Sequence, residues 1–292
     1  MSMEQTTPLF WQCRDRRVEF GERTRVMGIL NVTPDSFSDG GRFFDSRQAI
    51  EHGLQMARDG ADMIDVGGES SRPGAEPVPV EEELKRVVPV IKALSGETDC
   101  LLSVDTRKAR VAEASLAAGA HLINDITAMT HDPAMPAVAR DQGAGVILMH
   151  MRGDPKTMQL APAYGDVVEE VAGYLEQRIR DLEGVGLSRH SLAVDPGIGF
   201  GKTVEHNVSL IARVDRLAHL GRPVVIGLSR KSFIGTITGR EVQDRLPGSL
   251  AATAYVIQRG AHVIRVHDVK ESCDVARLMD ILRREEARDV DV

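Results

Sequence analysis

The chain has few cysteines. Its 292 residues contain three, Cys13, Cys100 and Cys273, an odd number at wide spacing. Such a set provides neither a disulfide framework nor the paired ligands of a zinc site. Low cysteine usage is typical of a reducing compartment, so we expect a cytoplasmic protein.

Long hydrophobic runs and excess positive charge are also missing. No run approaches the roughly 18 apolar residues expected of a membrane span. Residues 1–17 carry Glu4, Arg14 and Asp15 in place of an apolar leader, so no secretory signal is expected. The formal net charge of −7 argues against non-specific binding to nucleic acid or anionic membrane. The expected partners are therefore small molecules.

Two common catalytic motifs are absent. The sequence contains no G-x-S-x-G and no cysteine paired with a base, so covalent catalysis is not predicted. Residues 195–203, DPGIGFGKT, resemble a phosphate-binding loop, but Pro196 stands where the Walker pattern requires glycine. Proline also removes one backbone N–H from a loop that functions by presenting them. We expect these glycines to let the backbone approach a ligand, with Phe200 against its face.

A repeated pattern is what the chain does have. Eight short apolar runs each end in a polar or charged segment, and helical character follows each one. The runs begin at Val26, Met63, Leu101, Leu122, Val146, Leu192, Val224 and Val263. Glycines suited to a left-handed helix end occur at positions 60, 119, 143, 186, 221 and 260. Eight strand–helix units predict a closed, parallel (β/α)8 TIM barrel, in which the carboxyl ends of the strands converge on the active site.

One domain accounts for most of the length. Residues 25–286 are expected to form the barrel, residues 1–24 an extension with a short strand or hairpin over the barrel bottom, and residues 287–292 a tail. The expected helices are 46–59, 81–95, 107–118, 132–143, 165–184, 205–219, 246–259 and 270–286. Long loops are expected at 32–45, 68–80, 150–164 and 232–245. Pro89 is expected to kink or shorten the second helix.

Three of the runs end in a residue that can accept hydrogen bonds from a flat ligand. Asp105 and Asp195 end two of them, and Asn124 ends a third. The alternative for an aspartate after a strand is to cap the next helix, and a helix is expected soon after Asp105. Taken together, two carboxylates and an amide can hold a planar heterocycle by its ring nitrogens and amino group.

Basic residues end the last two runs. Lys231 follows the seventh run, and Arg265 and His267 follow the eighth, where such barrels commonly hold phosphate. Arg265, His267 and Arg72 together predict a diphosphate site, although a structural role for His267 is an equal alternative. Asn31 offers a neutral oxygen to magnesium, which takes few protein ligands when a diphosphate supplies the rest.

In their order, these segments resemble the dihydropteroate synthases of folate biosynthesis. The matching blocks are MGILNVTPDSFSDGG (27–41), DVGGESSRPGA (65–75), SVDT (103–106), NDI (124–126), HMRGDPKTMQ (150–159), DPGIGFGK (195–202), GLSRKSFIG (227–235) and RVHDV (265–269). They cover roughly residues 25–285. Ser71 departs from the threonine that the family often has, but it keeps the hydroxyl. Asp65 and His150 lie in matching blocks without a chemical task that the sequence defines.

The resemblance implies a transferase that joins p-aminobenzoate to 6-hydroxymethyl-7,8-dihydropterin diphosphate by dissociative substitution, giving 7,8-dihydropteroate and pyrophosphate. It also implies Mg²⁺ as cofactor, sulfonamides as substrate mimics, and a homodimer. The implied pterin site is Asp105, Asn124, Met149, Asp195, Phe200, Lys231 and Arg265. The implied diphosphate site is Asn31, Arg72, Arg265 and His267, with Asn31 also at the metal. The implied aminobenzoate site is Phe37, Asp39, Ser71, Arg72, Pro73 and Ser232, and the implied catalytic residues are Asp105, Lys231, Arg265 and His267.

Two alternatives stay open. A pterin-binding methyltransferase domain shares the pterin grip but has no use for a diphosphate site. A catalytically silent relative that binds pterin and acts through a partner is expected to lose residues such as Asn31 or Lys231, and both are present.

Overall fold

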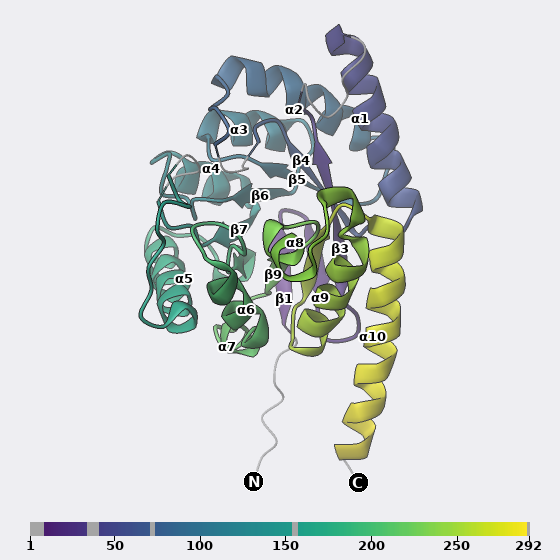
Figure 1. The fold of residues 1–292 in the computed structure, drawn as a ribbon. Helices are drawn as coiled ribbons and strands as arrows, with labels where there is room; N and C mark the ends of the chain where they lie inside the picture. Colours follow the sequence, from purple (N-terminus) through teal and green to yellow (C-terminus); the bar gives the residue numbers. More distant parts are fainter. Residues whose placement is uncertain (1–8, 34–40, 71–73, 154–156, 291–292) are drawn as a thin grey trace.

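Eight parallel strands form the centre of the molecule, and helices surround them (Figure 1). The computed structural model describes residues 9–33, 41–70, 74–153 and 157–290. The strands are β3 (Arg25–Asn31), β4 (Met63–Gly67), β5 (Leu101–Asp105), β6 (Leu122–Asp125), β7 (Gly145–Met149), β8 (Leu192–Asp195), β9 (Val225–Gly227) and β10 (Val263–Val266). They lie in the order β8-β7-β6-β5-β4-β3-β10-β9, and a parallel bridge between Val194 and Val224 joins the two outer strands. The predicted TIM barrel is confirmed.

Buried apolar side chains of the helices form one core with the outward-facing residues of the strands. The helices are α1 (Gly41–Arg58), α2 (Val80–Leu94), α3 (Ala109–Ala117), α4 (Met135–Gln142), α5 (Val167–Gly184), α6 (Val204–Ala212), α7 (Asp215–Ala218), α8 (Ser232–Thr238), α9 (Leu246–Gln258) and α10 (Val269–Val290), with 3-10 turns η2 (Arg189–Ser191) and η3 (Val242–Asp244). In α5, the Asp166 side chain accepts the N–H groups of Val168 and Glu169, which fixes the start of the helix. Gly143 ends α4 with φ 61°, the left-handed ending predicted for it.

Two predicted elements are wrong. The expected helix 205–219 is divided into α6 and α7, because Arg213 leaves helical geometry and pairs with Asp166 at the start of α5. The expected loop 232–245 contains α8 and η3. Burial of Phe233 and Ile234 outweighs the poor helix propensity of a segment rich in glycine and β-branched residues.

Smaller differences concern α2 and α3. Helix α2 continues through Pro89 to Leu94, so the expected shortening is absent. Helix α3 begins at Ala109 instead of Arg107, because Asp132 accepts the Ala109 N–H at 2.8 Å. The other expected helices match the structure to within a few residues.

A hairpin covers the amino ends of the strands. Strands β1 (Phe10–Cys13) and β2 (Arg16–Glu19) pair antiparallel, as predicted for this part of the chain. Trp11, Cys13, Val18 and Phe20 form one buried cluster with strand residues that face the barrel interior. Those strand residues are Met27, Met63, Leu101, Leu122, Ile147, Ala193, Val225 and Val263. The barrel interior at this end is filled by apolar side chains, which leaves the interior at the opposite end for polar chemistry.

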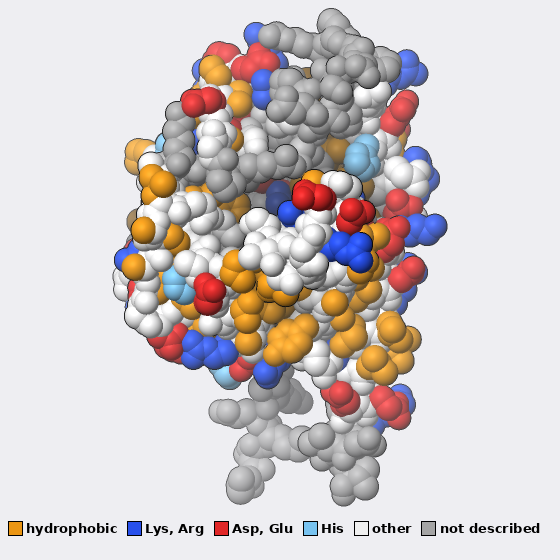
Figure 2. Space-filling model, in the orientation of Figure 1, with side chains coloured by type: hydrophobic (Ala, Val, Ile, Leu, Met, Phe, Trp, Pro, Cys, Tyr) orange, Lys and Arg blue, Asp and Glu red, His pale blue; other side chains and the backbone are white. Residues whose placement is uncertain are grey.

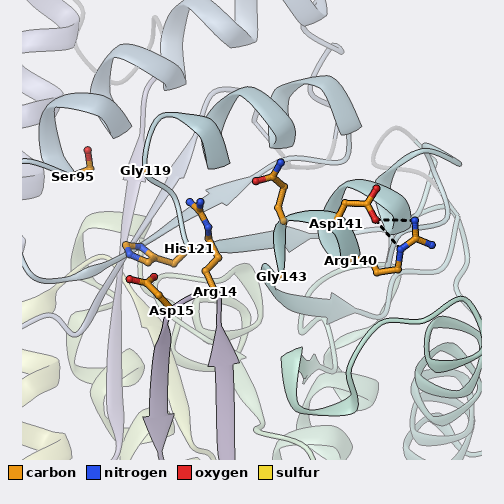
Figure 3. Close-up of a pocket in the computed structure, with 9 residues that line it drawn as sticks. Arg14, Asp15, Ser95, Gly119, His121, Arg140, Asp141 and Gly143 are labelled. Atoms are coloured by element: carbon orange, nitrogen blue, oxygen red, sulfur yellow. Dashed lines mark hydrogen bonds and ion pairs between the residues drawn. The ribbon is translucent and has the colours of Figure 1, made fainter.

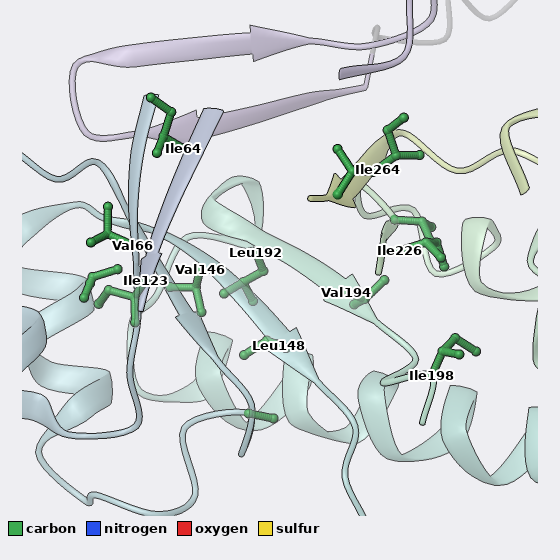
Figure 4. Close-up of a cluster of buried hydrophobic side chains, with 14 of the residues drawn as sticks. Ile64, Val66, Ile123, Val146, Leu148, Leu192, Val194, Ile198, Ile226 and Ile264 are labelled. Carbon is green, nitrogen blue, oxygen red and sulfur yellow. The ribbon is translucent and has the colours of Figure 1, made fainter. Parts of the chain in front are cut away.

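Strand alternation separates the two sides of the sheet. Ile64 and Val66 of β4 face the helix layer, and so do Val146 and Leu148 of β7 (Figure 4). The residues between them face the interior, because successive side chains of a strand point to opposite faces. Asp65 therefore points into the barrel. Among the described residues, no helix is both long and apolar enough to cross a membrane.

Candidate active site

Arg265 connects the polar residues at the carboxyl ends of the strands. Its Nε donates to Asp65 Oδ2 at 2.6 Å, and its NH2 group donates to Asp105 Oδ2 at 2.8 Å. The same Asp65 oxygen accepts from Asn124 Nδ2 at 2.8 Å. The guanidinium of Arg265 on β10 thus joins β4 and β5, and Asp65 connects β6 to the same set of bonds. Such charge-assisted bonds fix the planar group in one orientation.

Asp105 is a carboxylate in an environment that disfavours its charge. Burial raises the pKa of Asp105 to about 7, although the charge of Arg265 opposes the shift. Nearby Asp65, Glu83 and Asp125 raise this pKa further. A carboxylate held this way gains most when a positive charge develops beside it.

The helix-capping alternative for Asp105 is wrong. Asp132 supplies the acceptor for the first N–H of α3, so the Asp105 side chain is free to face the barrel mouth and bind Arg265. Gly67 separates Asp105 from Asn31: a Cβ at Gly67 would lie 3.7 Å from Asn31 Oδ1 and 3.8 Å from Asp105 Oδ2. Asn31 and Asp105 therefore line the same part of the mouth.

Asp195 and Lys231 form the second half of the site. Asp195 is buried, and burial raises its pKa, whereas the Gly197 N–H and the charges of Lys231, Arg265 and Lys202 oppose the shift. Burial lowers the pKa of Lys231 to about 8. Lys231 Nζ donates to the carbonyl of Ile198 and lies 4.4 Å from the centre of the Phe200 ring.

Met149 also lies in this second half of the site. It is buried beside Asp195, its register partner on β8, and precedes the loop that follows β7. The structure thus brings the predicted pterin residues into two adjoining groups, one around Arg265 and one around Lys231.

The glycine-rich loop after β8 is held against the chain after β7. Gly197 has φ 66°, and a Cβ there would lie 2.0 Å from the His150 carbonyl oxygen. Only glycine fits at that distance and in that backbone conformation. The sequence predicted that these glycines let the backbone approach a ligand; at Gly197 the close approach is to the backbone of His150.

His267 lies at the end of β10 beside Ser229. Its Nδ1 is 3.0 Å from Ser229 Oγ, and its backbone N–H donates to the same oxygen at 3.2 Å. Arg230, with φ 58°, pairs through two nitrogens with Asp268. These contacts fasten the segment with Lys231 to the segment with His267. Ser232 is the exposed first residue of α8.

Several predicted residues lie outside the described part of the chain. They are Phe37, Asp39, Ser71, Arg72 and Pro73. The structure places Asn31, Asp105, Asn124, Met149, Asp195, Phe200, Lys231, Arg265 and His267 at the carboxyl ends of the strands or in the loops that follow, and Ser232 at the start of α8.

Asp65 is the main residue to which sequence reasoning assigned no task. It lies two positions before the end of β4, and strand alternation places it on the same inner face as Gly67. That period-two signal was available in the sequence. The pairing of Asp65 with Arg265, 200 residues away, follows from the strand order and could not be predicted from the sequence pattern.

A hollow of about 820 Å³ lies at the other end of the barrel (Figure 3). Arg14, His121 and Gly143 are among its lining residues, and Arg140 pairs with Asp141 at its edge. These positions precede or flank the amino ends of β6 and β7. The hollow is therefore remote from the residues that carry the chemistry.

Comparisons with known proteins agree with this arrangement. Residues 27–267 match the family described as pterin binding enzyme. The chain is 49% identical over 255 residues to a dihydropteroate synthase of Escherichia coli K12, covering 87% of this chain and 90% of that one. A solved dihydropteroate synthase of Xanthomonas albilineans with 4-aminobenzoic acid superposes with a TM-score of 0.89 at 48% identity, covering 95% and 99% of the two chains.

A second solved structure extends the match to a drug complex. The dihydropteroate synthase of Yersinia pestis with a sulfonamide drug superposes with a TM-score of 0.88 at 43% identity, covering 94% and 99% of the two chains. The chain therefore belongs to the pterin binding enzymes and, within that family, to the dihydropteroate synthases.

Proposed function

We propose that the chain condenses p-aminobenzoate with 6-hydroxymethyl-7,8-dihydropterin diphosphate, forming 7,8-dihydropteroate and pyrophosphate in folate biosynthesis. The observation that carries the proposal is the Asp65–Arg265–Asp105 array, with Asn124 bonded to Asp65 at the barrel mouth. It combines acceptors for a planar ring with a fixed cation. The relatives named above support the choice of substrates.

The pterin binds between the two halves of the site. Asp195 and Asn124 supply acceptors and a donor for its amino group and ring nitrogens, and Lys231 donates to its carbonyl edge. Phe200, Met149 and the flat face of Arg265 contact the ring. Burial strengthens each of these bonds, because the surroundings compete less than water does.

Departure of the diphosphate is the chemical step. The bond between the pterin methylene carbon and the bridging oxygen breaks, and its electron pair leaves with the pyrophosphate. Positive charge then develops on the methylene and spreads into the ring. The Asp105 carboxylate, held by Arg265, stabilises that charge, while Arg265 and His267 stabilise the anion that leaves.

Carbon–nitrogen bond formation needs little help from the protein. The aromatic amine attacks the cation with its lone pair and then loses one proton. A dissociative substitution of this kind is consistent with the lack of a nucleophile–base pair in the sequence. Ser232, with Phe37, Asp39, Ser71, Arg72 and Pro73, forms the proposed aminobenzoate site, where a sulfonamide would compete.

Magnesium fits the residues present at the diphosphate end. Asn31 is a neutral oxygen donor, and the described residues contain no cluster of three or more His, Cys, Asp or Glu side chains able to hold a metal alone. Such a site suits an ion that receives most of its ligands from the substrate and water. When bound with the substrate, the ion would supply charge neutralisation to the diphosphate.

The assembled form we propose is a homodimer in the cytoplasm. Ile237 of α8, Tyr255 of α9, and Leu278, Ile281 and Leu282 of α10 are between 43% and 59% exposed. Helix α9 packs against both α8 and α10, and Figure 2 shows hydrophobic side chains gathered on the lower part of this face. A self-complementary contact would remove that apolar surface from water.

One incubation distinguishes the synthase from its alternatives. The protein is mixed with the pterin diphosphate, p-aminobenzoate and magnesium, and pyrophosphate is measured. Release that requires all the components is expected. A methyltransferase domain or a silent relative would bind pterin without releasing pyrophosphate, and that result would refute the proposal.

A further inference from the structure

Lys202 is a buried cation to which the proposed reaction gives no task. The residue is 3% exposed. Its Nζ donates to the carbonyl of Phe200 at 3.0 Å and to the carbonyl of His150 at 3.3 Å, and lies 3.0 Å from His150 Nδ1. Burial, together with the charge of Lys202, lowers the pKa of His150 to about 3. The ammonium is therefore surrounded by neutral groups.

A buried charge of this kind is costly unless another charge offsets it. Burial lowers the pKa of Lys202 to about 7, and the charge of Asp195 opposes that shift while Lys231 adds to it. The offset is mutual, because Lys202 also favours the ionised form of Asp195. Below about pH 7 Lys202 carries its charge, and that charge favours the ionised form of Asp195.

The same ammonium belongs to a set of bonds that fixes the loop after β8. Four successive carbonyls of this loop, those of Ile198, Gly199, Phe200 and Gly201, accept from Lys231, Gln159, Lys202 and Tyr164 respectively. The Gly199 N–H donates to the buried Asn207 side chain at 2.8 Å. The loop is thus held from the site side by Lys231 and from the interior by Lys202.

We propose that Lys202 is a positioning residue of the pterin site, whose hydrogen bonds to the carbonyls of Phe200 and His150 hold the loop after β8 in place and whose buried ammonium acts on Asp195 from the interior side of that loop. The inference rests on the proposed function, in which the Asp195 carboxylate accepts hydrogen bonds from the pterin. Lys231 and Arg265 also face Asp195, but both are assigned to the ligand. Lys202 is the third described cation that acts on Asp195, and its Nζ contacts His150.

The test is the pH dependence of pterin binding without turnover. Binding of 6-hydroxymethyl-7,8-dihydropterin is followed by fluorescence from about pH 5 to pH 9 in the wild type, Lys202→Met and Lys202→Arg. Affinity that requires ionised Asp195 is present above its pKa and is lost as the pH falls through it. Removal of the Lys202 charge raises that pKa, so affinity is lost at a higher pH.

We expect Lys202→Met to lose affinity at a higher pH than the wild type does, with a difference of about tenfold at the pH where the two profiles differ most and convergence at alkaline pH. Lys202→Arg keeps the charge and should keep the wild-type profile. Lys270→Met, which removes an exposed lysine of α10, is the control and should match the wild type. Asp105 also titrates in this range, but the charges that act on it are those of Arg265, Asp65, Glu83 and Asp125, which are common to all variants.

The inference would be overturned if Lys202→Met lost affinity at the same pH as the wild type. It would also be overturned if Lys202→Met bound the dihydropterin more weakly by the same factor at every pH, because that result indicates a purely structural role. If Lys202→Met does not fold, Lys202→Gln removes the charge while keeping a donor, and the same two outcomes apply. A wild-type chain that fails to bind the dihydropterin would overturn the proposed function itself, and this inference with it.

Discussion

Arg265 and its two carboxylates explain how the site is organised at the scale of single residues. The guanidinium faces Asp65, which is wholly buried, and Asp105, which lies at the opening. Sequence reasoning selected Arg265 and Asp105 because they end strands. It assigned no role to Asp65, because the contact joins residues from opposite halves of the chain.

Substitution of Asp105 tests the charge beside the methylene. Asp105→Asn keeps the size of the side chain and an acceptor for Arg265 but removes the negative charge. We expect kcat to fall by at least about 100-fold with a smaller change in pterin binding. Steady-state pyrophosphate release measures this, and unchanged turnover would refute the role of Asp105.

The pH profile of the wild type follows from the same groups. Asp105 must be ionised and has a pKa of about 7, so kcat/KM should rise as the pH increases through that value. Lys231 must be protonated and has a pKa of about 8, so kcat/KM should fall above it. We therefore expect a narrow, bell-shaped dependence of kcat/KM on pH. A profile that is flat from about pH 6 to 9 would contradict both assignments.

At the scale of elements, the glycines of the loop after β8 let that loop lie against the chain after β7. The sequence predicted that these glycines let the backbone approach a ligand, whereas Gly197 lies against the carbonyl of His150. Four carbonyls of this loop accept hydrogen bonds from four side chains that lie in three segments of the chain. These tertiary contacts cannot be predicted from a local sequence pattern. The helix α8 was missed for a related reason, since packing of its apolar side chains overrides propensity.

Substitution of two glycines that have the same backbone geometry distinguishes the cost of backbone strain from the cost of a steric clash. Gly197 and Gly221 have φ of 66° and 64°, but a Cβ meets the His150 carbonyl only at Gly197 and nothing within 4 Å at Gly221. Gly221→Ala should cost about 1 kcal/mol of unfolding free energy. Gly197→Ala should cost more and weaken pterin binding by at least about tenfold. Denaturant unfolding and fluorescence titration measure both, and equal behaviour would show that contact with His150 is unimportant.

A second charged cluster fixes the base of the loop after β4. Lys108 Nζ contacts Glu69, the buried Glu83 and the carbonyl of Val78, and Thr106 donates to Glu83 at 2.6 Å. Lys108→Met leaves two carboxylates with one fewer cation and should cost about 3 kcal/mol of unfolding free energy.

The double variant Lys108→Met/Glu83→Gln removes both charges and keeps an acceptor for Thr106, so it should regain most of that stability. The exposed pair Arg110–Glu81 on the neighbouring surface provides the control, since Arg110→Met should change stability by less than about 0.5 kcal/mol. A double variant as unstable as the single one would contradict the charge argument.

At the scale of the whole molecule, the barrel was the most predictable feature. The eight apolar runs, with glycines after the helices, predict the number of strands and the end of the barrel where the site lies. The hairpin was predicted from alternation near Val18. The pairing partners across the barrel mouth were not predictable, because they arise only when the sheet closes.

The exposed face of α8, α9 and α10 leads to a prediction about assembly. We expect a solution mass of twice the 31.8 kDa of one chain by light scattering. Leu278→Glu/Ile281→Glu should give a monomer, because burying two charges at the contact is unfavourable. Val185→Glu, at an exposed apolar residue after α5, is the control and should remain a dimer. A wild-type mass of one chain would refute the dimer.

The central claim is that the barrel mouth exchanges a diphosphate for an aromatic amine at a pterin methylene. The most direct measurement follows 7,8-dihydropteroate and pyrophosphate together after the pterin diphosphate, p-aminobenzoate and magnesium are added to the purified chain. The account predicts that both products appear in equal amounts and only when both substrates are present. Pyrophosphate without dihydropteroate, or neither product, would contradict it.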